Sequence, residues 1–308
     1  MLLIKNVLFP TDRTAWSKSV FEHAVFYAGR HGARLHALTV TWDEAAETLD
    51  PPEADDAFRT GLRATAAAAG VELVEAERQV FSPDAGILDY AAEIDADLIV
   101  MATHGRRGLS HAFIGSVAES VVRRAACPVL TARPSAPYHG VAAKRILVPL
   151  DFSAHARKAL AHARELHRLT GAELHLLHVL QTLPAYGIVD APPEPHPMSE
   201  AERTAAEEAL REIAAEVLGA TDGSAASPAF HVIGGMGNPA LDVLDAAARL
   251  DADLIVMATH GRTGVRRFFL GSVAEKVVQL APCPVFTVKA FEKSLLPGTE
   301  ARLHHETA

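Results

Sequence analysis

The sequence predicts an α/β protein made of two tandem, doubly wound domains, each a mainly parallel sheet with helices on both faces. Three observations predict this fold. The segment 95–119 recurs as 251–275 with six of its twenty-five residues changed. Strand-like runs alternate with helix-like segments through both halves, as in βαβ units. The strand runs LIVM and ILVPL are continuously apolar, as expected of strands that are covered on both sides.

The first half opens with an apolar run at 3–9, which Pro10 breaks and which predicts the first strand. Apolar residues at helical spacing then predict a helix over 14–30, which Gly32 can cap. An acidic, proline-interrupted excursion at 43–57 leads into the second helix. A strand at 34–40 precedes this excursion, and the second helix ends near Gly70. The elements expected after it are strand 71–80, helix 84–93, strand 97–102, a helix from Ser116 and strand 128–131.

The second half repeats this order around a loop at 181–198 that holds five prolines. Ser199 followed by Glu202 is a helix-start signature. The expected elements are strand 145–150, helix 154–169 before Gly171, strand 173–180, a helix from Ser199, strand 229–233, a helix from Pro239, strand 253–258 and a last strand at 284–288. We therefore place the domains at 1–133 and 144–290, with a linker at 134–143 and a polar, disordered tail at 291–308.

Composition and charge exclude several classes of protein. A chain of 308 residues with a formal net charge of −9 is long enough for two cores and disfavours non-specific nucleic-acid or membrane-surface binding. No apolar run approaches the ~20 residues that span a bilayer. The first residues enter a strand without a secretion signal, so we expect a cytoplasmic protein. Cys127 and Cys283 lack CxxC spacing and are expected to be small buried residues, not zinc ligands or redox centres.

A loop punctuated by glycines follows the same strand in both halves. It reads ATHG, nine residues, then Gly115-Ser116 or Gly271-Ser272. The free N–H groups and dipole of a helix start favour anions, and arginines in the loop add positive charge, so a phosphate cradle is one interpretation. The alternative is structural. Ser116 with Glu119, and its repeat in the second half, fit a capping box that satisfies the helix's own donors without a ligand.

An aspartate follows the first strand of each half, Asp12 in PTDRT and Asp151 in PLDFS. Ligands of doubly wound sheets bind outside the carboxyl ends of the strands, where such a carboxylate can accept hydrogen bonds from a ribose or a base amino group. The alternative is a helix N-cap. Arg13 can extend across the mouth of the site or pair with a phosphate, and both remain open. His104 and His260 are interpreted as turn-stabilising histidines rather than as groups that polarise water.

These motifs resemble the universal stress proteins. The resemblance lies in Gly-x2-Gly-x9-Gly-Ser/Thr after a strand, the aspartate after the first strand, and the closing segments HGRRG…GSVAES…CPV and HGRTG…GSVAEK…CPV, in two family-length copies. It implies a five-stranded sheet of order 3-2-1-4-5 in each half. It also implies adenine-nucleotide binding, with phosphates on the glycine loop and the base and ribose near the aspartate. Family members commonly dimerise through the last strand, so 128–131 and 284–288 are expected to pair within this chain as a pseudo-dimer, with a homodimer left open.

The resemblance carries a set of binding residues over to each half by position. The first set is Asp12, Val40, Gly105, Arg106, Gly115, Ser116 and Val117; the second is Asp151, Val179, Gly261, Arg262, Gly271, Ser272 and Val273. Core packing alone explains the two strand valines equally well. The first glycine of the motif is replaced by Ala102 and Ala258, which narrows the approach to a phosphate. The second half keeps a Gly237-Asn238-Pro239 turn that the first lacks, so we expect it to be the better site.

The leading functional hypothesis is a cytoplasmic stress-response protein that binds ATP, or AMP or ADP, with Mg²⁺ as an optional companion ion and an unidentified protein partner. A nucleotide-free interaction protein and a slow ATPase are the alternatives. The sequence has no GxxxxGK[ST] loop, no HExxH and no GxSxG motif, so enzymatic activity beyond weak ATP hydrolysis is disfavoured. The segments 43–57 and 181–198 differ most between the halves, and partner specificity is expected there.

Overall fold

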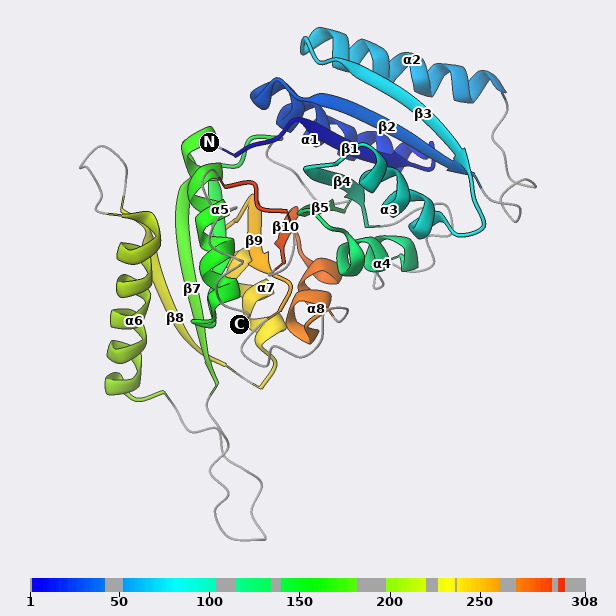
Figure 1. Cartoon of the computed structure of the whole chain (residues 1–308). Helices are drawn as coiled ribbons and strands as arrows, with labels where there is room; N and C mark the ends of the chain where they lie inside the picture. The colour runs from blue at the N-terminus through cyan, green and yellow to red at the C-terminus, as the bar shows by residue number, and fades with distance from the viewer. Residues whose placement is uncertain are drawn as a thin grey trace, which may run out of the picture.

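A single ten-stranded sheet runs through the molecule in the order β3-β2-β1-β4-β5-β10-β9-β6-β7-β8 (Figure 1). Each half contributes five strands in the order 3-2-1-4-5, which confirms the predicted α/β fold and strand order. The computed structural model describes the chain except at residues 1, 42–51, 104–114, 134–139, 182–197, 220–226, 236, 261–269, 290–292 and 297–308.

The elements of the two halves follow the same sequence along the chain. The first half contains β1 (Asn6–Thr11), α1 (Ala15–His31), β2 (Arg34–Thr41), α2 (Pro52–Ala68), β3 (Leu73–Gln79), α3 (Pro83–Glu93), β4 (Leu98–Ala102), α4 (Ser116–Arg124) and β5 (Val129–Ala132). The second half contains β6 (Arg145–Pro149), α5 (Ala154–Thr170), β7 (Glu173–Gln181), α6 (Glu200–Leu218), β8 (Ala229–Gly235), α7 (Pro239–Arg249), β9 (Leu254–Ala258), α8 (Ser272–Leu280) and β10 (Val285–Val288).

The halves join through their last strands. Strands within each half are parallel, whereas β5 and β10 pair antiparallel, with Phe286 opposite Leu130. The hydroxyl of Thr287 donates to the carbonyl of Val129 at 3.0 Å across this junction. The predicted pairing of the last strands within the chain is therefore confirmed, and it removes two sheet edges that would otherwise invite aggregation.

Helices cover both faces of the sheet, and each face has one core that spans both halves. The core on one face is formed with α1, α2, α5 and α6, and the core on the other with α3, α4, α7 and α8. In Figure 1 the helices α2 and α6 lie at opposite ends of the sheet, each beside an edge strand. Phe286 is fully buried at the junction, with its ring centroid 6.5 Å from that of Tyr27 and 6.3 Å from that of His162.

Helix ends follow the predicted local signals. Gly32 and Gly171 end α1 and α5 in the left-handed region, with φ of 62° and 75°, where glycine carries no steric penalty. Ser199 and Glu202 form a capping box at the start of α6, as predicted.

A repeated aspartate fixes the amino edge of the sheet in both halves. Oδ2 of Asp97 accepts hydrogen bonds from the backbone N–H groups of Lys5 and Asn6 at 2.7 and 2.9 Å. Oδ2 of Asp253 does the same for Lys144 and Arg145, at 2.9 and 2.8 Å. These bonds hold the start of the first strand against the start of the fourth. The register of these two central strands is thereby set, and their carboxyl ends are brought to the opposite edge together.

Part of the expected tail packs against the first half. Leu295 is fully buried, and its carbonyl accepts the backbone N–H of Leu3 at 2.8 Å. The ammonium group of Lys293 pairs with Asp95 and Asp97. The expectation of a disordered polar tail is therefore wrong for 293–296, because this segment crosses back from the second half and joins the core of the first.

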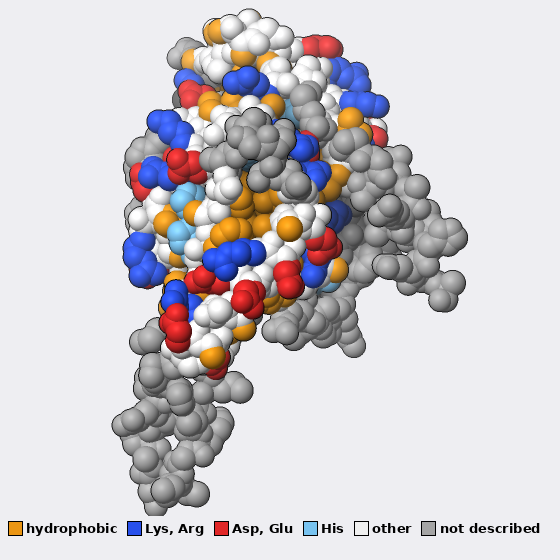
Figure 2. Space-filling model, turned by 90° about the vertical axis from the view of Figure 1, so that its left-hand side faces the viewer, with side chains coloured by type: hydrophobic (Ala, Val, Ile, Leu, Met, Phe, Trp, Pro, Cys, Tyr) orange, Lys and Arg blue, Asp and Glu red, His pale blue; other side chains and the backbone are white. Residues whose placement is uncertain are grey.

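Figure 2 shows the side of the molecule that carries α6, where acidic and basic side chains are interspersed. On α6 itself Glu207 pairs with Arg203 and Arg211 at 3.1 and 3.0 Å, one helical turn away on either side. These two pairs neutralise part of the acidic charge of the helix, which carries more glutamates than arginines. Among the described residues, no helix has both the length and the apolar character needed to cross a membrane.

Candidate functional site

The candidate site of each half lies at the carboxyl edge, where the strand order reverses. The ladder between β1 and β4 covers only Val7 and Leu8, and both strands continue beyond it, to Thr11 and Ala102. The ladder between β6 and β9 is equally short. Since β1 leads outward to β2 and β4 leads outward to β5, this is the position at which doubly wound sheets bind ligands. The residues after β1 and after β4 therefore come to one edge.

Each predicted aspartate holds a turn ahead of a helix. Oδ1 of Asp12 accepts hydrogen bonds from the backbone N–H and the hydroxyl of Thr14, at 3.1 and 2.7 Å. Oδ1 of Asp151 accepts from the backbone N–H of Ser153 at 3.1 Å. The N-caps of α1 and α5 are Thr14 and Ser153, so the alternative that the aspartates cap these helices is wrong. Both carboxylates are partly exposed at the edge.

The residue after each aspartate adopts a left-handed backbone, with φ of 64° at Arg13 and 66° at Phe152. Residues other than glycine rarely adopt this backbone conformation, and those that do are found preferentially at functional sites. The turn directs both side chains back over the second strand of their half. Nε of Arg13 donates to Thr39 at 3.4 Å, and the ring of Phe152 lies 4.2 Å from that of His178.

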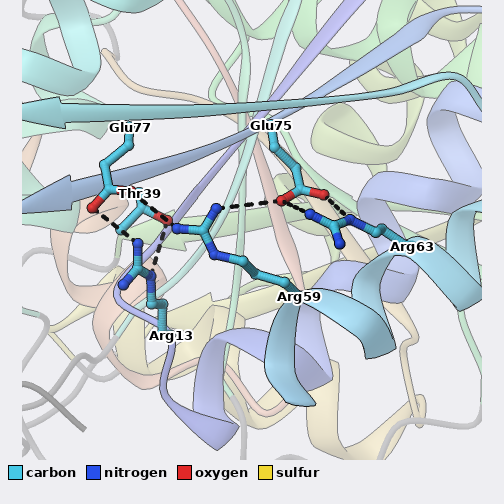
Figure 3. Close-up of polar contacts among 6 residues, drawn as sticks. All are labelled: Arg13, Thr39, Arg59, Arg63, Glu75 and Glu77. Carbon is cyan, nitrogen blue, oxygen red and sulfur yellow. Dashed lines mark hydrogen bonds and ion pairs between the residues drawn. The ribbon is translucent and has the colours of Figure 1, made fainter. Parts of the chain in front are cut away.

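A chain of alternating charges holds Arg13 in this position (Figure 3). Its guanidinium pairs with Glu77 of β3 at 3.0 Å and its side chain is only 11% exposed. Arg59 of α2 bridges Glu77 and Glu75, at 3.0 and 3.5 Å, and Arg63 donates to Glu75 at 3.0 Å. Of the two roles left open for Arg13, the structure shows neither, because the guanidinium is directed toward Glu77 of β3. The turn that carries Asp12 is thereby linked to α2.

The last helix of each half starts without a side-chain cap. Helices α4 and α8 begin at Ser116 and Ser272, the N-cap positions are Gly115 and Gly271, and no side-chain hydrogen bond caps either helix. The capping-box alternative is therefore wrong, since each serine stands one residue inside its helix. Both serines are exposed. Within the described part of the chain, no N-cap side chain accepts the first-turn N–H groups of these two helices, which lie at the positive end of the helix dipole.

A close approach of the backbone favours glycine at both N-cap positions. The N–H of Gly115 donates to the carbonyl of Thr103 at 2.8 Å, and a Cβ at this position would lie 3.2 Å from that oxygen. Gly271 makes the same bond to Thr259 at 2.8 Å, with 3.0 Å left for a Cβ. The bond draws the helix start to the end of the preceding strand. This explains the glycines without reference to a ligand.

The two departures from the glycine motif are compatible with the fold. Ala102 and Ala258 are the last residues of β4 and β9 and pair with Ala132 and Val288. Extended strand backbone accommodates alanine without strain, so the missing glycines cost nothing in backbone conformation.

The predicted valines lie beneath the same edge. Val40 is buried, and Val179 is partly buried against the same core. Val117 and Val273, in the first turns of α4 and α8, also pack on this core. Their packing is consistent with both a structural and a ligand-contacting role. The remaining predicted residues, Gly105, Arg106, Gly261 and Arg262, lie outside the described residues, as does His104. Nδ1 of His260 lies 2.9 Å from the hydroxyl of Thr259.

A further carboxylate, which the sequence analysis did not single out, lies at the edge of the second half. Oδ2 of Asp242, in the first turn of α7, is buried beside Gly235 and Val179. A Cβ on Gly235 would lie 3.1 Å from this oxygen and 3.0 Å from Cγ1 of Val179. No periodicity in the sequence marks this contact. Aligning α3 and α7 at Pro83 and Pro239 places Gly86 opposite Asp242, which marks the position as one where the halves differ.

Comparison with known proteins agrees with this architecture. The profile described as the Universal stress protein family matches residues 3–133 and 142–289. A universal stress protein of Methanocaldococcus jannaschii is 34% identical over 152 residues, which are 49% of this chain and 84% of that relative. A universal stress protein of Thermus aquaticus is 37% identical over 146 residues, 47% of this chain and 98% of the relative.

Solved structures that match nearly the whole chain share its fold. A universal stress protein from Archaeoglobus fulgidus covers 92% of this chain and 98% of its own, with a TM-score of 0.61 and 23% identity. A putative universal stress protein from Pseudomonas aeruginosa covers 93% of both chains, with a TM-score of 0.65 and 22% identity. The arrangement of two such halves in one chain therefore recurs in other proteins.

Proposed function

Because the chain belongs to the universal stress protein family, we propose that it is a stress-response module in which each half binds an adenine nucleotide. The nucleotide we propose first is ATP. The observation that carries the proposal is the start of α4 and α8. Each helix opens without a cap from its N-cap residue, at the same carboxyl edge of the sheet as the turn that bears Asp12 or Asp151.

The phosphates would lie on the helix starts. Backbone N–H groups around Ser116 and Ser272, the two exposed hydroxyls and the helix dipoles together favour an anion. The loops that precede them carry Gly105 and Arg106, or Gly261 and Arg262, which we propose as further phosphate ligands by their place in the sequence. If Mg²⁺ accompanies the nucleotide, its bonds would be chiefly to phosphate oxygens and water.

The ribose and the base would lie over the carboxyl ends of the first two strands of each half. Asp12 and Asp151 each have one oxygen committed to the following turn, and a carboxylate has further lone pairs that can accept from ribose hydroxyls. Val40 and Val179 provide apolar contacts at the ends of the second strands. We place the stronger site in the second half, where Asn238 caps α7 by accepting the N–H of Ala240 at 3.2 Å, whereas Ser82 makes no such bond to α3.

Nucleotide occupancy would act by changing which conformation the edge loops adopt, and thereby which partner binds. A ligand shifts such an equilibrium only by its differential affinity for the two states. The turn of Asp12 is connected through Arg13, Glu77 and Arg59 to α2, so a change at the first site has a defined path to the outer surface of that half. This role requires binding and release of nucleotide, without turnover.

The test is isothermal titration of the full chain with ATP, using variants that place a negative charge at the helix starts. Ser116→Asp and Ser272→Asp alter exposed residues, and aspartate in the first turn of a helix stabilises the fold. Each variant is therefore expected to melt at or above the wild-type temperature. Each should lose one equivalent of bound ATP, and the double variant should lose both. Ser116→Ala and Ser272→Ala are the matched controls and should lose much less affinity, since only the hydroxyl is removed.

Two results would contradict the proposal. One is unchanged ATP binding in the folded double aspartate variant, which would place any nucleotide elsewhere. The other is no saturable binding by the folded wild type up to millimolar ATP. The second result would favour a nucleotide-free interaction protein.

A further inference from the structure

We infer that strand β8 is a docking edge for a second copy of this chain, which adds its own β8 in antiparallel order and extends one sheet through both copies. This edge lies at the free end of the second half. Its pairing does not depend on whether a nucleotide is bound.

Two strands of the ten-stranded sheet have a neighbouring strand on one side only. They are β3 in the first half and β8 in the second, at the two ends of the strand order (Figure 1). Strand β8 pairs in parallel with β7 over all seven of its residues, and no strand among the described residues pairs with its other side. An edge of this kind presents backbone N–H and C=O groups that can pair with a further strand.

Charged side chains protect the edge at β3. Three of its seven residues are charged, and Arg59 and Arg63 of α2 pair with Glu77 and Glu75 of this strand (Figure 3). If two copies of β3 paired antiparallel about the central residue Ala76, Glu75 of each copy would stand opposite Glu77 of the other. Like charges directly opposite each other destabilise a strand pair. Self-pairing is therefore disfavoured at this end of the sheet.

The edge at β8 has no such protection. Its sequence, AFHVIGG, contains no lysine, arginine, aspartate or glutamate, and residues 229–233 are partly exposed. In an antiparallel pair of two β8 strands about the central residue Val232, His231 of each copy stands opposite Ile233 of the other. No two residues of like charge oppose each other in this arrangement. The second half thus leaves open the kind of edge that the first half protects.

The chain already joins two uncharged strands in this way, which identifies the occupant as a second copy. Strands β5 and β10, with the sequences VLTA and VFTV, pair antiparallel where the halves meet. Two β8 strands make the same type of pair, and because both copies use the same strand the contact is closed by a twofold axis. Assembly then stops at two copies, since the edge left on each copy is the charged strand β3.

The experiment places a charge at the centre of this contact and measures the mass of the full chain by sedimentation velocity. The wild type is expected to have the mass of two chains and to dissociate on dilution. Val232→Glu gives β8 the charge that β3 carries at Glu77, because these residues stand opposite the sixth residue of β7 and of β2. It should weaken the dimer at least about tenfold, since two glutamates meet across the twofold axis.

Two variants serve as matched controls. Val232→Thr keeps the branched shape at the centre of the strand without a charge and should keep the dimer. Gln79→Glu adds the same negative charge as Val232→Glu, but at an exposed position on β3, the opposite edge of the sheet, and should leave association unchanged. Thermal melting shows that each variant is folded.

Charge reversal separates a lost contact from a damaged fold. Val232→Lys alone should be as monomeric as Val232→Glu, because two lysines then meet. A mixture of the two variants should form a mixed dimer, because opposite charges then stand across the axis. In the wild type, the backbone amides of β8 should exchange hydrogen more slowly in the dimer than in the diluted monomer.

Three results would overturn the inference. A monomeric wild type would leave β8 as an edge for an extended peptide of another protein. A dimer that folded Val232→Glu leaves at wild-type strength would place the contact elsewhere on the surface. Failure of the folded Val232→Glu and Val232→Lys variants to form a mixed dimer would show that residue 232 does not face its own copy.

Discussion

The ammonium group of Lys293 lies 2.7 Å from Oδ1 of Asp97, a residue of the other half of the chain. The same ammonium lies 2.6 Å from Oδ2 of Asp95. Asp97 is buried, and its second oxygen already accepts two backbone N–H groups at the start of the sheet. Burial lowers the pKa of Lys293, but the hydrogen bonds to Asp95 and Asp97 outweigh it and raise that pKa, so the ammonium group is charged at neutral pH. The segment after β10 is therefore bound to the first half at its amino edge.

Replacing Lys293 by methionine should lower the free energy of unfolding at pH 7 by about 1–2 kcal/mol, because buried Asp97 loses a charged donor. The effect is full at pH 7, since a lysine with a raised folded-state pKa loses its contribution only when the pH rises through that pKa. Urea unfolding measures the loss. Arg249→Met, which breaks an exposed pair with Asp245, should change stability by less than about 0.5 kcal/mol. Equal effects of the two variants would show that the contact with Asp97 is not stabilising.

Both halves should unfold together. Each hydrophobic core contains residues of both halves, and Phe286 lies fully buried where they meet. Calorimetry of the wild type is expected to show a single heat transition. Phe286→Ala should lower the free energy of unfolding by about 3–5 kcal/mol and keep one transition. Phe230→Ala, on the partly exposed edge strand β8, should cost less. Two resolved transitions in the wild type would contradict the shared core.

Much of the fold was predictable because the sequence contains two copies of the same pattern of strands and helices. The repeated segment placed β4, β9, α4 and α8, and the resemblance supplied the strand order and the pairing of β5 with β10. The helix starts were harder. The pattern Ser-x-x-Glu is the same whether serine stands at the N-cap or one residue later. The hydrogen bond from Gly115 to Thr103 decides between them, and that contact depends on tertiary structure.

The contacts that sequence reasoning missed join residues with no common periodicity. Lys293 and Leu295 stand in a polar segment, yet one pairs with Asp97 and the other is buried. Asp242 lies on α7, and the spacing of apolar residues in this helix predicts only which of its faces packs on the core. Its contact with Gly235 is seen only in the three-dimensional structure. Contacts of this kind arise from the meeting of separate elements, which the local pattern of either element does not encode.

The close contact between Val80 and Gly86 has a direct test in stability. Gly86→Ala should lower the free energy of unfolding by about 1–3 kcal/mol, because the new Cβ would meet Cγ1 of Val80 at 2.6 Å in a packed core. Val80→Ala removes that methyl group, so the double variant Val80→Ala/Gly86→Ala should lose less than the sum of the two single variants. Urea unfolding of all four proteins gives the coupling. Additive losses would mean that the two positions do not press on each other.

Buried histidines should make the protein less stable in mild acid. His162 is fully buried against Phe286, and burial lowers its pKa to about 4, outweighing the hydrogen bond to the carbonyl of Lys158 that would raise it. Burial likewise lowers the pKa of His23 to about 4. In the unfolded chain each histidine has a pKa of about 6.5. The unfolded state therefore binds more protons between these values.

Stability is thus expected to be full above pH 6.5 and to be lost as the pH falls from about 6.5 toward 4, with each histidine contributing up to about 1.4 kcal/mol per pH unit. His162→Gln should remove one of the two contributions. The measurement is urea unfolding of wild type and variant at pH 7.5 and 5.5, comparing the difference between the two pH values, because the variant also changes packing at every pH. A series from pH 7.5 to 8.5, where both histidines are neutral in both states, is the control. If the variant loses as much stability as the wild type between pH 7.5 and 5.5, the acid sensitivity originates elsewhere, and His162 is not held neutral by its burial.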